Sequence, residues 1–237
     1  WLVFTPDEEI GSGADLLDLT RIQADFAYTV DGGALNILSY ETFNAASASV
    51  HIKGRNIHPG SAKGRMKNAA TIAMRFRSLL PPKEIPEETE GYEGFYHLNM
   101  MTGEEEEASL SYILRDHDAD KLEEKKRRML LAAKEINRLF GGGTAEVSIK
   151  DSYRNMGEII RNHPHIIERA KRAIAACGMQ PETVPIRGGT DGARLSFRGL
   201  PCPNLGTGGE NAHGVYEFLP VQALDKMVEV LVEIVRA

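Results

Sequence analysis

Two adjacent glutamates, Glu8 and Glu9, follow the apolar run Trp1–Thr5, which is predicted to form a strand. Neighbouring side chains leave the backbone in different directions, so the two carboxylates can take separate roles. One can bind a cation, while the other takes a proton from a water molecule at that cation. A solvated acidic turn is the simpler interpretation of any Glu-Glu pair, so this dipeptide does not define a site by itself.

Asp31 and His213 are two further candidate metal ligands. Asp31 follows the predicted strand 26–30, and the carboxyl ends of strands in open α/β sheets commonly bind ligands. His213 precedes a glycine in a polar loop, where its imidazole can complete a carboxylate site for Zn²⁺, Mn²⁺ or Co²⁺. An Asp-Gly turn and a surface histidine are the alternatives. The acidic pair, Asp31 and His213 support one another because all fall in loops at a predicted sheet edge.

Three basic or imidazole side chains are candidates for substrate binding. Arg187 precedes a glycine-rich turn, and an arginine there can hold a carboxylate through two parallel hydrogen bonds. Arg115 ends an alternating strand and could provide a second carboxylate contact or only an edge ion pair. His58 lies in a loop before Pro59 and Gly60, from which it could donate a hydrogen bond to a substrate oxygen.

The flanking parts of the chain are predicted to form one α/β domain. Apolar runs alternate with helical segments there, as expected for a sheet covered by helices. The last predicted helix carries apolar residues at helical spacing, including Val221, Leu224 and Val228, which are expected to face the core.

The central residues have a different pattern and are predicted to form a separate inserted domain. Strand-like alternation and helical spacing follow each other in the order β-α-β-β-α-β, which is the ferredoxin-like arrangement. The expected boundaries are residues 1–43 and 154–237 for the outer domain and 44–153 for the insertion. The predicted strands lie near residues 48–52, 93–101, 110–114 and 145–149, and the predicted helices near 66–80 and 122–140.

Composition excludes several classes of protein. The 237 residues include 28 Lys and Arg against 34 Asp and Glu, a net charge of −6, which argues against nucleic acid or an anionic membrane as a partner. Apolar runs stay short of the roughly 18 residues that a membrane span requires. Two cysteines, Cys177 and Cys202, cannot form a disulfide framework, which favours the cytoplasm.

Five segments together resemble the M20 family of di-zinc metallopeptidases, and the resemblance runs the whole length in the same motif order. It implies a three-layer α/β catalytic domain of the zinc-exopeptidase type, only partly present, with an inserted ferredoxin-like lid. The segments are Thr5–Gly11, Val30–Gly33, Asn56–Gly60, Arg187–Gly192 and Gly208–Gly214.

The resemblance also implies roles for individual residues. Glu8 would be the general base that takes a proton from a metal-bridging water. Glu9 and Asp31 would bind opposite metal ions of a two-zinc site, and His213 would bind the same ion as Glu9.

The implied activity is a cytoplasmic metallo-aminopeptidase, a hydrolase that releases the first residue from tripeptides. His58 would reach from the lid to stabilise the tetrahedral oxyanion. Arg187 and Arg115 would bind the C-terminal carboxylate of the short peptide. A homodimer is left open.

One departure from the family limits these expectations. The family's site also uses the histidine of a His-x-Asp motif and a bridging aspartate, and none of the seven histidines here has an aspartate two positions on. The strand predicted at Trp1 points the same way, and roughly the first 40% of an ordinary two-domain enzyme is expected to be missing. Without a bridging carboxylate, this polypeptide alone is predicted to be inactive and to bind metal poorly.

Two alternatives remain for the function. A deacylase or carboxypeptidase that acts on N-acyl amino acids would use the same fold. A non-catalytic regulatory or assembly domain is the alternative from a different class. Glu8, Glu9, Asp31 and His213 occurring together argue against it, because a purely structural role has no need of all four.

Overall fold

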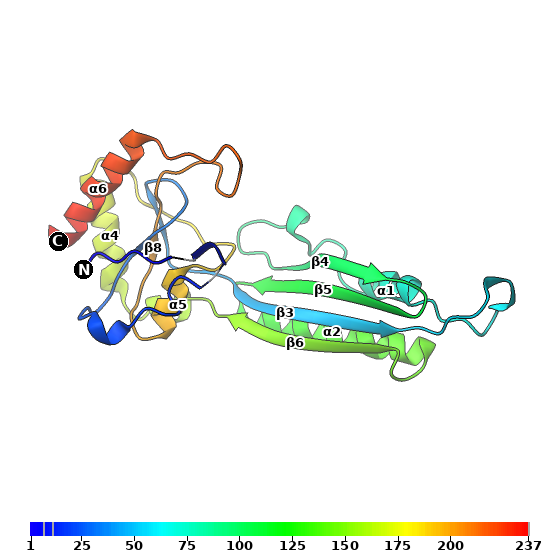
Figure 1. Cartoon of the computed structure of the whole chain (residues 1–237). Coiled ribbons are helices and arrows are strands. Elements are labelled where there is room, and N and C mark those ends of the chain that lie inside the picture. The colour runs from blue at the N-terminus through cyan, green and yellow to red at the C-terminus, as the bar shows by residue number, and fades with distance from the viewer. Residues whose placement is uncertain (7, 11, 237) are drawn as a thin grey trace. The chain divides into compact units, whose positions relative to one another are not determined.

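The computed structural model describes residues 1–237 except Asp7, Gly11 and Ala237. Asp7 and Gly11 belong to the acidic motif of the family resemblance, and that part of the motif lies outside the described residues. The chain divides into two compact units (Figure 1). The outer unit comprises Trp1–Phe43 and Arg154–Ala237, and the inserted unit comprises Asn44–Tyr153.

The inserted unit contains an antiparallel sheet of four long strands. They are β3 (Asn44–Lys53), β4 (Phe95–Gly103), β5 (Glu107–Asp116) and β6 (Ala145–Tyr153). Their spatial order is β4-β5-β3-β6, and β3 pairs with β5 from Asn44 opposite Asp116 to Lys53 opposite Glu107. This order, together with the two helices between the strands, confirms the predicted ferredoxin-like arrangement.

Two helices pack on the sheet of the inserted unit, α1 (Ala69–Ser78) and α2 (Ala119–Phe140). Each begins at a side-chain cap: Asn68 accepts from the Thr71 amide, and Asp118 accepts from the Lys121 amide. Figure 1 shows α2 running along the sheet beneath β3 and β6. Short 3-10 turns, η3 (Pro59–Ser61) and η4 (Pro86–Glu88), lie in the connecting loops. The inward residues form one core: Val50, Ile52, Ile72, Phe76, Leu110, Tyr112, Leu114, Met129 and Ile136 are prominent members.

The outer unit contains a smaller sheet of very short strands, in the order β1-β8-β2-β7. Strand β8 pairs parallel to β1 and antiparallel to β2, and β2 pairs parallel to β7. The strands are β1 (Thr29–Val30), β2 (Ile37–Ser39), β7 (Glu182–Thr183) and β8 (Asn204–Leu205).

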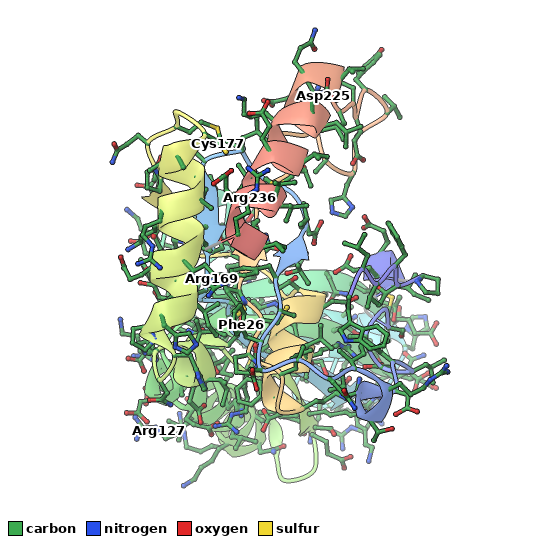
Figure 2. All side chains as sticks on the ribbon, turned by 90° about the vertical axis from the view of Figure 1, so that its left-hand side faces the viewer. Phe26, Arg127, Arg169, Cys177, Asp225 and Arg236 are labelled. Atoms are coloured by element: carbon green, nitrogen blue, oxygen red, sulfur yellow. The ribbon has the colours of Figure 1, made fainter. Side chains whose placement is uncertain are left out.

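Helices complete the outer unit. Figures 1 and 2 show α4 and α6 side by side, and buried residues from both, such as Ile174 and Val230, share one core. In the middle of α4, the Arg169 guanidinium lies 5.6 Å from the centre of the Phe26 ring (Figure 2). The helical elements are η1 (Glu8–Ile10), η2 (Leu19–Arg21), α3 (Gly157–Ile160), α4 (Pro164–Ala176), α5 (Asp191–Phe197) and α6 (Val221–Arg236).

One strand prediction for the outer unit is wrong, and a second is confirmed only in part. Trp1–Thr5 forms no strand, and Trp1 and Phe4 are 79% and 93% exposed. An apolar run becomes a strand only where a neighbouring backbone accepts and donates its hydrogen bonds. The predicted strand 26–30 has ladder pairing only at Thr29–Val30.

The predicted inward face of the last helix is also wrong. Val221, Leu224 and Val228 are exposed, whereas Ala223, Met227, Val230 and Ile234 are buried. This helix carries apolar residues on more than one face, so helical spacing alone could not select the one that packs. None of the described helices is long and apolar enough to cross a membrane.

Candidate functional site

The outer unit brings the predicted acidic and imidazole residues into one neighbourhood. Glu8 and Glu9 lie on η1, Asp31 follows β1 directly, and His213 lies in the loop before α6. The Nδ1 atom of His213 is 3.3 Å from Oε2 of Glu9. Two candidate ligands from opposite ends of the sequence are therefore within contact distance.

Electrostatic coupling links these carboxylates. Burial raises the pKa of Glu8, and the nearby charges of Asp31, Asp191 and Glu9 raise it further, while His213 lowers it. Burial likewise raises the pKa of Asp31, and Glu9 and Asp191 add to the rise. A set of carboxylates that repel one another in this way is one that a bound cation would stabilise.

The loop that carries His213 has an unusual backbone. His213 and Asn211 have φ values of 61° and 58°, in the left-handed region that residues other than glycine seldom adopt. The His213 amide donates to Oε2 of Glu217 at 3.0 Å, and the Gly214 amide donates to the Asn211 carbonyl at 2.9 Å. These contacts hold a strained turn, a feature that is common at functional sites.

The position of Asp31 is fixed by strands β1 and β8. The Asp31 amide donates to the Leu205 carbonyl at 2.9 Å, and Nδ2 of Asn204 donates to the Asp31 carbonyl at 2.7 Å. Gly32 and Gly33 then turn the chain with φ values of 54° and 76°. Asp31 therefore lies directly after the last paired residue of β1.

Asp191 is a residue of this neighbourhood that the sequence analysis missed. It is 5% exposed, and its carboxylate accepts hydrogen bonds from the Thr5 hydroxyl and the Ala14 amide, both at 3.0 Å. Its motif, Arg187–Gly192, drew attention only to the arginine. An aspartate that follows the N-cap Thr190 at the start of a helix gives no sequence signal of contacts with residues 5 and 14.

The two candidate substrate-binding arginines each stack on an aromatic ring of their own unit. The Arg187 guanidinium lies 5.2 Å from the centre of the Phe43 ring in the outer unit. In the inserted unit, the Arg115 guanidinium lies 4.8 Å from the centre of the Tyr153 ring, and burial lowers the pKa of Arg115. Stacking restricts the plane of a guanidinium, which favours two-point binding of a carboxylate.

His58 lies at the tip of a loop in the inserted unit. It caps the short turn η3, where Nδ1 accepts a hydrogen bond from the Gly60 amide at 3.2 Å. Because Nδ1 is the acceptor, the proton of the neutral ring lies on Nε2, which is the nitrogen available as a donor. Participation of His58 and Arg115 in the acidic site remains a prediction.

The described residues provide only part of a metal site. Carboxylates with an imidazole are suitable donors for Zn²⁺ and similar ions. Glu9 and His213 form a pair, but within the described residues no group of three His, Cys, Asp or Glu side chains could hold a metal ion. The donor chemistry fits a metal site, and the ligand set is incomplete.

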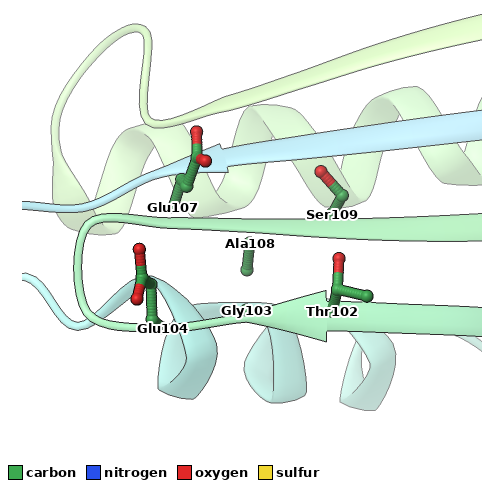
Figure 3. Close-up of a pocket in the computed structure, with 6 residues that line it drawn as sticks. All are labelled: Thr102, Gly103, Glu104, Glu107, Ala108 and Ser109. Atoms are coloured by element: carbon green, nitrogen blue, oxygen red, sulfur yellow. The ribbon is translucent and has the colours of Figure 1, made fainter.

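One surface hollow of the inserted unit does not belong to this site. It lies at the turn between β4 and β5, and Figure 3 shows the side chains around it. None of the candidate residues lines it. The lining residues are Thr102, Gly103, Glu104, Glu107, Ala108 and Ser109.

The chain belongs to the peptidase family M20/M25/M40, whose model matches residues 1–237. It is 54% identical over 234 residues to the Peptidase T of Caldanaerobacter subterraneus subsp. tengcongensis, which covers 99% of this chain and 57% of the relative. It is also 54% identical over 233 residues to the Peptidase T of Clostridium perfringens, with 98% and 57% coverage. The predicted family is confirmed, and the chain spans a little over half the length of these relatives.

Solved structures support the same fold. The aminopeptidase PepT from Bacillus cereus matches with a TM-score of 0.83 and 26% identity, covering 97% of this chain and 62% of that chain. A tripeptidase from Staphylococcus aureus matches with a TM-score of 0.84 and 23% identity, at 98% and 62% coverage. The YXEP protein of Bacillus subtilis, described as a dinuclear metal binding peptidase, matches at 0.71 and 17%, with 98% and 62% coverage. The predicted fold class is therefore confirmed.

Proposed function

We propose that this chain provides part of the active site of a zinc-dependent aminopeptidase that releases the N-terminal residue from tripeptides. The observation that carries the proposal is the acidic cluster of the outer unit, in which Oε2 of Glu9 lies 3.3 Å from Nδ1 of His213. Identity of 54% to two proteins named Peptidase T supports the peptide substrate.

In this proposal, Glu9 and His213 bind one zinc ion and Asp31 binds the other. Two zinc ions, when bound in a complete site, would polarise the peptide carbonyl and lower the pKa of water. Glu8 is the general base: its carboxylate takes a proton from the attacking water and passes it to the leaving amine. A pKa raised by burial and by neighbouring carboxylates makes Glu8 better matched to this transfer near neutral pH.

The substrate-binding roles fall to both units. Arg187 and Arg115 bind the C-terminal carboxylate of the peptide, each with its guanidinium plane held by a stacked ring. His58 donates from Nε2 to the oxyanion that forms at the scissile carbonyl. Binding of the C-terminal carboxylate would help to limit the substrates to short peptides.

The incomplete ligand set has a direct consequence. Glu9 with His213 gives two protein ligands to one ion, and Asp31 gives a single ligand to the other, whereas stable zinc sites have three or four protein ligands. We therefore propose that the isolated 237-residue chain binds zinc weakly and does not turn over tripeptides at an ordinary enzymatic rate. Free cysteines Cys177 and Cys202 support a place in the cytoplasm.

A chimera tests the proposed function in a complete protein. The 233 matching residues of the Clostridium perfringens Peptidase T would be replaced by this chain. The chimera, supplied with Zn²⁺, should release the first residue of a tripeptide, and acetylation of the substrate's amine should abolish cleavage. Cleavage of the acetylated substrate would favour the deacylase alternative, and no cleavage of either would favour the non-catalytic one.

A further inference from the structure

Within the outer unit, helix α5 contacts residues on either side of the two glutamates and also the strand that Asp31 follows. We propose that Asp191, Arg194 and Arg198 are positioning residues that hold the segment carrying the two glutamates in place relative to Asp31. The proposal rests on the function proposed for that cluster. Whether these residues hold the segment in place can be measured by hydrogen exchange, without metal or substrate.

Asp191 closes the glutamate-bearing segment into a loop. Its Oδ2 accepts from the Thr5 hydroxyl and its Oδ1 accepts from the Ala14 amide, each at 3.0 Å. Thr5 precedes the two glutamates and Ala14 follows them, so one carboxylate binds both ends of the stretch. At 5% exposure, this carboxylate would be costly to bury without these hydrogen bonds.

Gly13 allows this close approach. A Cβ atom at position 13 would lie 2.2 Å from Oδ2 of Asp191, well inside van der Waals contact. The Asp191 carboxylate cannot move aside cheaply because both of its oxygens are hydrogen-bonded. Glycine at position 13 is therefore required by the contact with α5.

Two arginines extend the attachment along the same face of the helix. Arg194 forms an ion pair with Asp15, and Arg198 donates to the carbonyls of Ala14 and Leu17. Asp191 and Arg194 are three positions apart on one side of α5, and Arg198 is the residue that caps its C-terminal end. Charge-assisted hydrogen bonds to two carbonyl groups three residues apart hold the backbone that follows the glutamates.

Helix α5 also contacts Thr29 of β1 and Cys202, which precedes β8. A Cβ atom at Gly192 would lie 2.5 Å from the Cys202 carbonyl oxygen and 3.0 Å from Oγ1 of Thr29. The Ser196 hydroxyl donates to the Gly192 carbonyl at 2.7 Å and accepts from the Cys202 amide at 3.0 Å. The helix therefore packs against Thr29 of β1, the strand that Asp31 follows.

Asn204 completes the connection from the helix to Asp31. The Thr29 hydroxyl donates to Oδ1 of Asn204 at 2.8 Å, and Nδ2 of Asn204 donates to the Asp31 carbonyl at 2.7 Å. The path from the glutamate-bearing segment through α5 to Asp31 consists of short hydrogen bonds and close backbone packing. This path therefore links the position of the glutamate-bearing segment to that of Asp31.

Two replacements of Asp191 distinguish the effect of its hydrogen bonds from the effect of its charge. Asp191→Asn keeps one oxygen to accept from the Ala14 amide and gains an amide that can donate to the Thr5 hydroxyl. Asp191→Ala loses both contacts. The matched control is Asp225→Ala, since Asp225 is an exposed aspartate on α6 (Figure 2).

Amide hydrogen exchange by mass spectrometry on the 237-residue chain is the test. Asp191→Ala should accelerate exchange in residues 12–17 by about tenfold or more, while α4 and α6 keep their protection. Asp191→Asn and Asp225→Ala should exchange like the unsubstituted chain. Unchanged exchange in Asp191→Ala would overturn the proposal, and so would an equal loss across α4 and α6.

A second variant keeps the test decisive if Asp191→Ala does not fold. Arg198→Lys retains the charge but not the forked donors, and should accelerate exchange in residues 14–17 by about threefold. No acceleration there would contradict the proposal. Failure of the chimera to cleave tripeptides would overturn the proposed function and leave these exchange results standing, so the two failures are distinguishable.

Discussion

The inserted and outer units are built from strands of very different length. Strands β3 to β6 of the inserted unit have nine or ten residues each, whereas those of the outer unit have two or three. Long paired strands bury alternate side chains in one continuous core. The outer unit instead relies on turns, helix contacts and side-chain hydrogen bonds, and it holds the candidate site.

The inserted and outer units also differ in the exposure of some of their large apolar side chains. Tyr96, Phe76 and Tyr112 of the inserted unit are fully buried. In the outer unit, Phe4 and Val235 are 93% and 83% exposed. The main core cluster of the inserted unit also has more buried members than that of the outer unit, so we expect the inserted unit to be the more stable and the unit with the candidate site the less stable.

The largest expected effect on stability is loss of a core aromatic in the inserted unit. Phe76→Ala should lower the free energy of unfolding of that unit by about 3–5 kcal/mol, because Phe76 is completely buried on α1. Urea denaturation followed by hydrogen exchange would measure it. Met74→Ala is the control, as Met74 is 60% exposed on the same helix and should have little effect. An equal loss of unfolding free energy in both units would contradict the expectation that the two units unfold separately.

A smaller loss of stability is expected when a core residue of the outer unit is replaced. Ile174→Ala should destabilise the packing of α4 on α6 by about 2–4 kcal/mol, since Ile174 is fully buried between them. Hydrogen exchange should rise in α4 and α6 and stay unchanged in β3 and β5. A rise that extends into the inserted sheet would show that the two units unfold together.

Tyr112→Phe should stabilise the inserted unit by about 1 kcal/mol. Among the described residues, the buried Tyr112 hydroxyl has no hydrogen-bond partner, and burial raises its pKa from 10.0 to about 12. The unfolded chain therefore loses this proton at lower pH than the folded chain, so stability falls as the pH rises from 10 towards 12. Denaturation series at several pH values should show a shallower alkaline loss in the variant. An unchanged slope would contradict the assignment.

The smallest effect is expected at the candidate site. His213→Ala should change the free energy of unfolding by no more than about 0.5 kcal/mol, because the side chain is 77% exposed. Thermal unfolding without metal would measure it. A loss of several kcal/mol would mean that His213 supports the outer unit rather than a site.

The fold of the inserted unit could be predicted because the sequence patterns that determine it are local. Val50 and Ile52 alternate with polar residues along β3, and Met129 and Ile136 follow helical spacing on α2. Each pattern spans two or more helical turns or a whole strand, so the period is unambiguous. Their order then selects the fold.

The outer unit was harder to predict because its contacts join distant residues. An apolar run such as Trp1–Thr5 has the sequence pattern of a strand whether or not a partner strand pairs with it. Motif content led to Glu9, Asp31 and His213, but the role of Asp191 depends on Thr5 and Ala14, which no local pattern connects to it. Sequence motifs could therefore locate the candidate ligands but not what holds them.

Replacement of Glu8 in the chimera tests the central claim most directly, namely that the acidic cluster is catalytic. Glu8→Gln should retain bound zinc, measured on the purified protein, while tripeptide turnover falls by about 10²–10⁴-fold. Glu168→Gln, at an exposed position on α4, is the matched control and should keep full activity. Turnover within a factor of about three of the unsubstituted chimera would contradict the account, since general-base catalysis contributes far more than that.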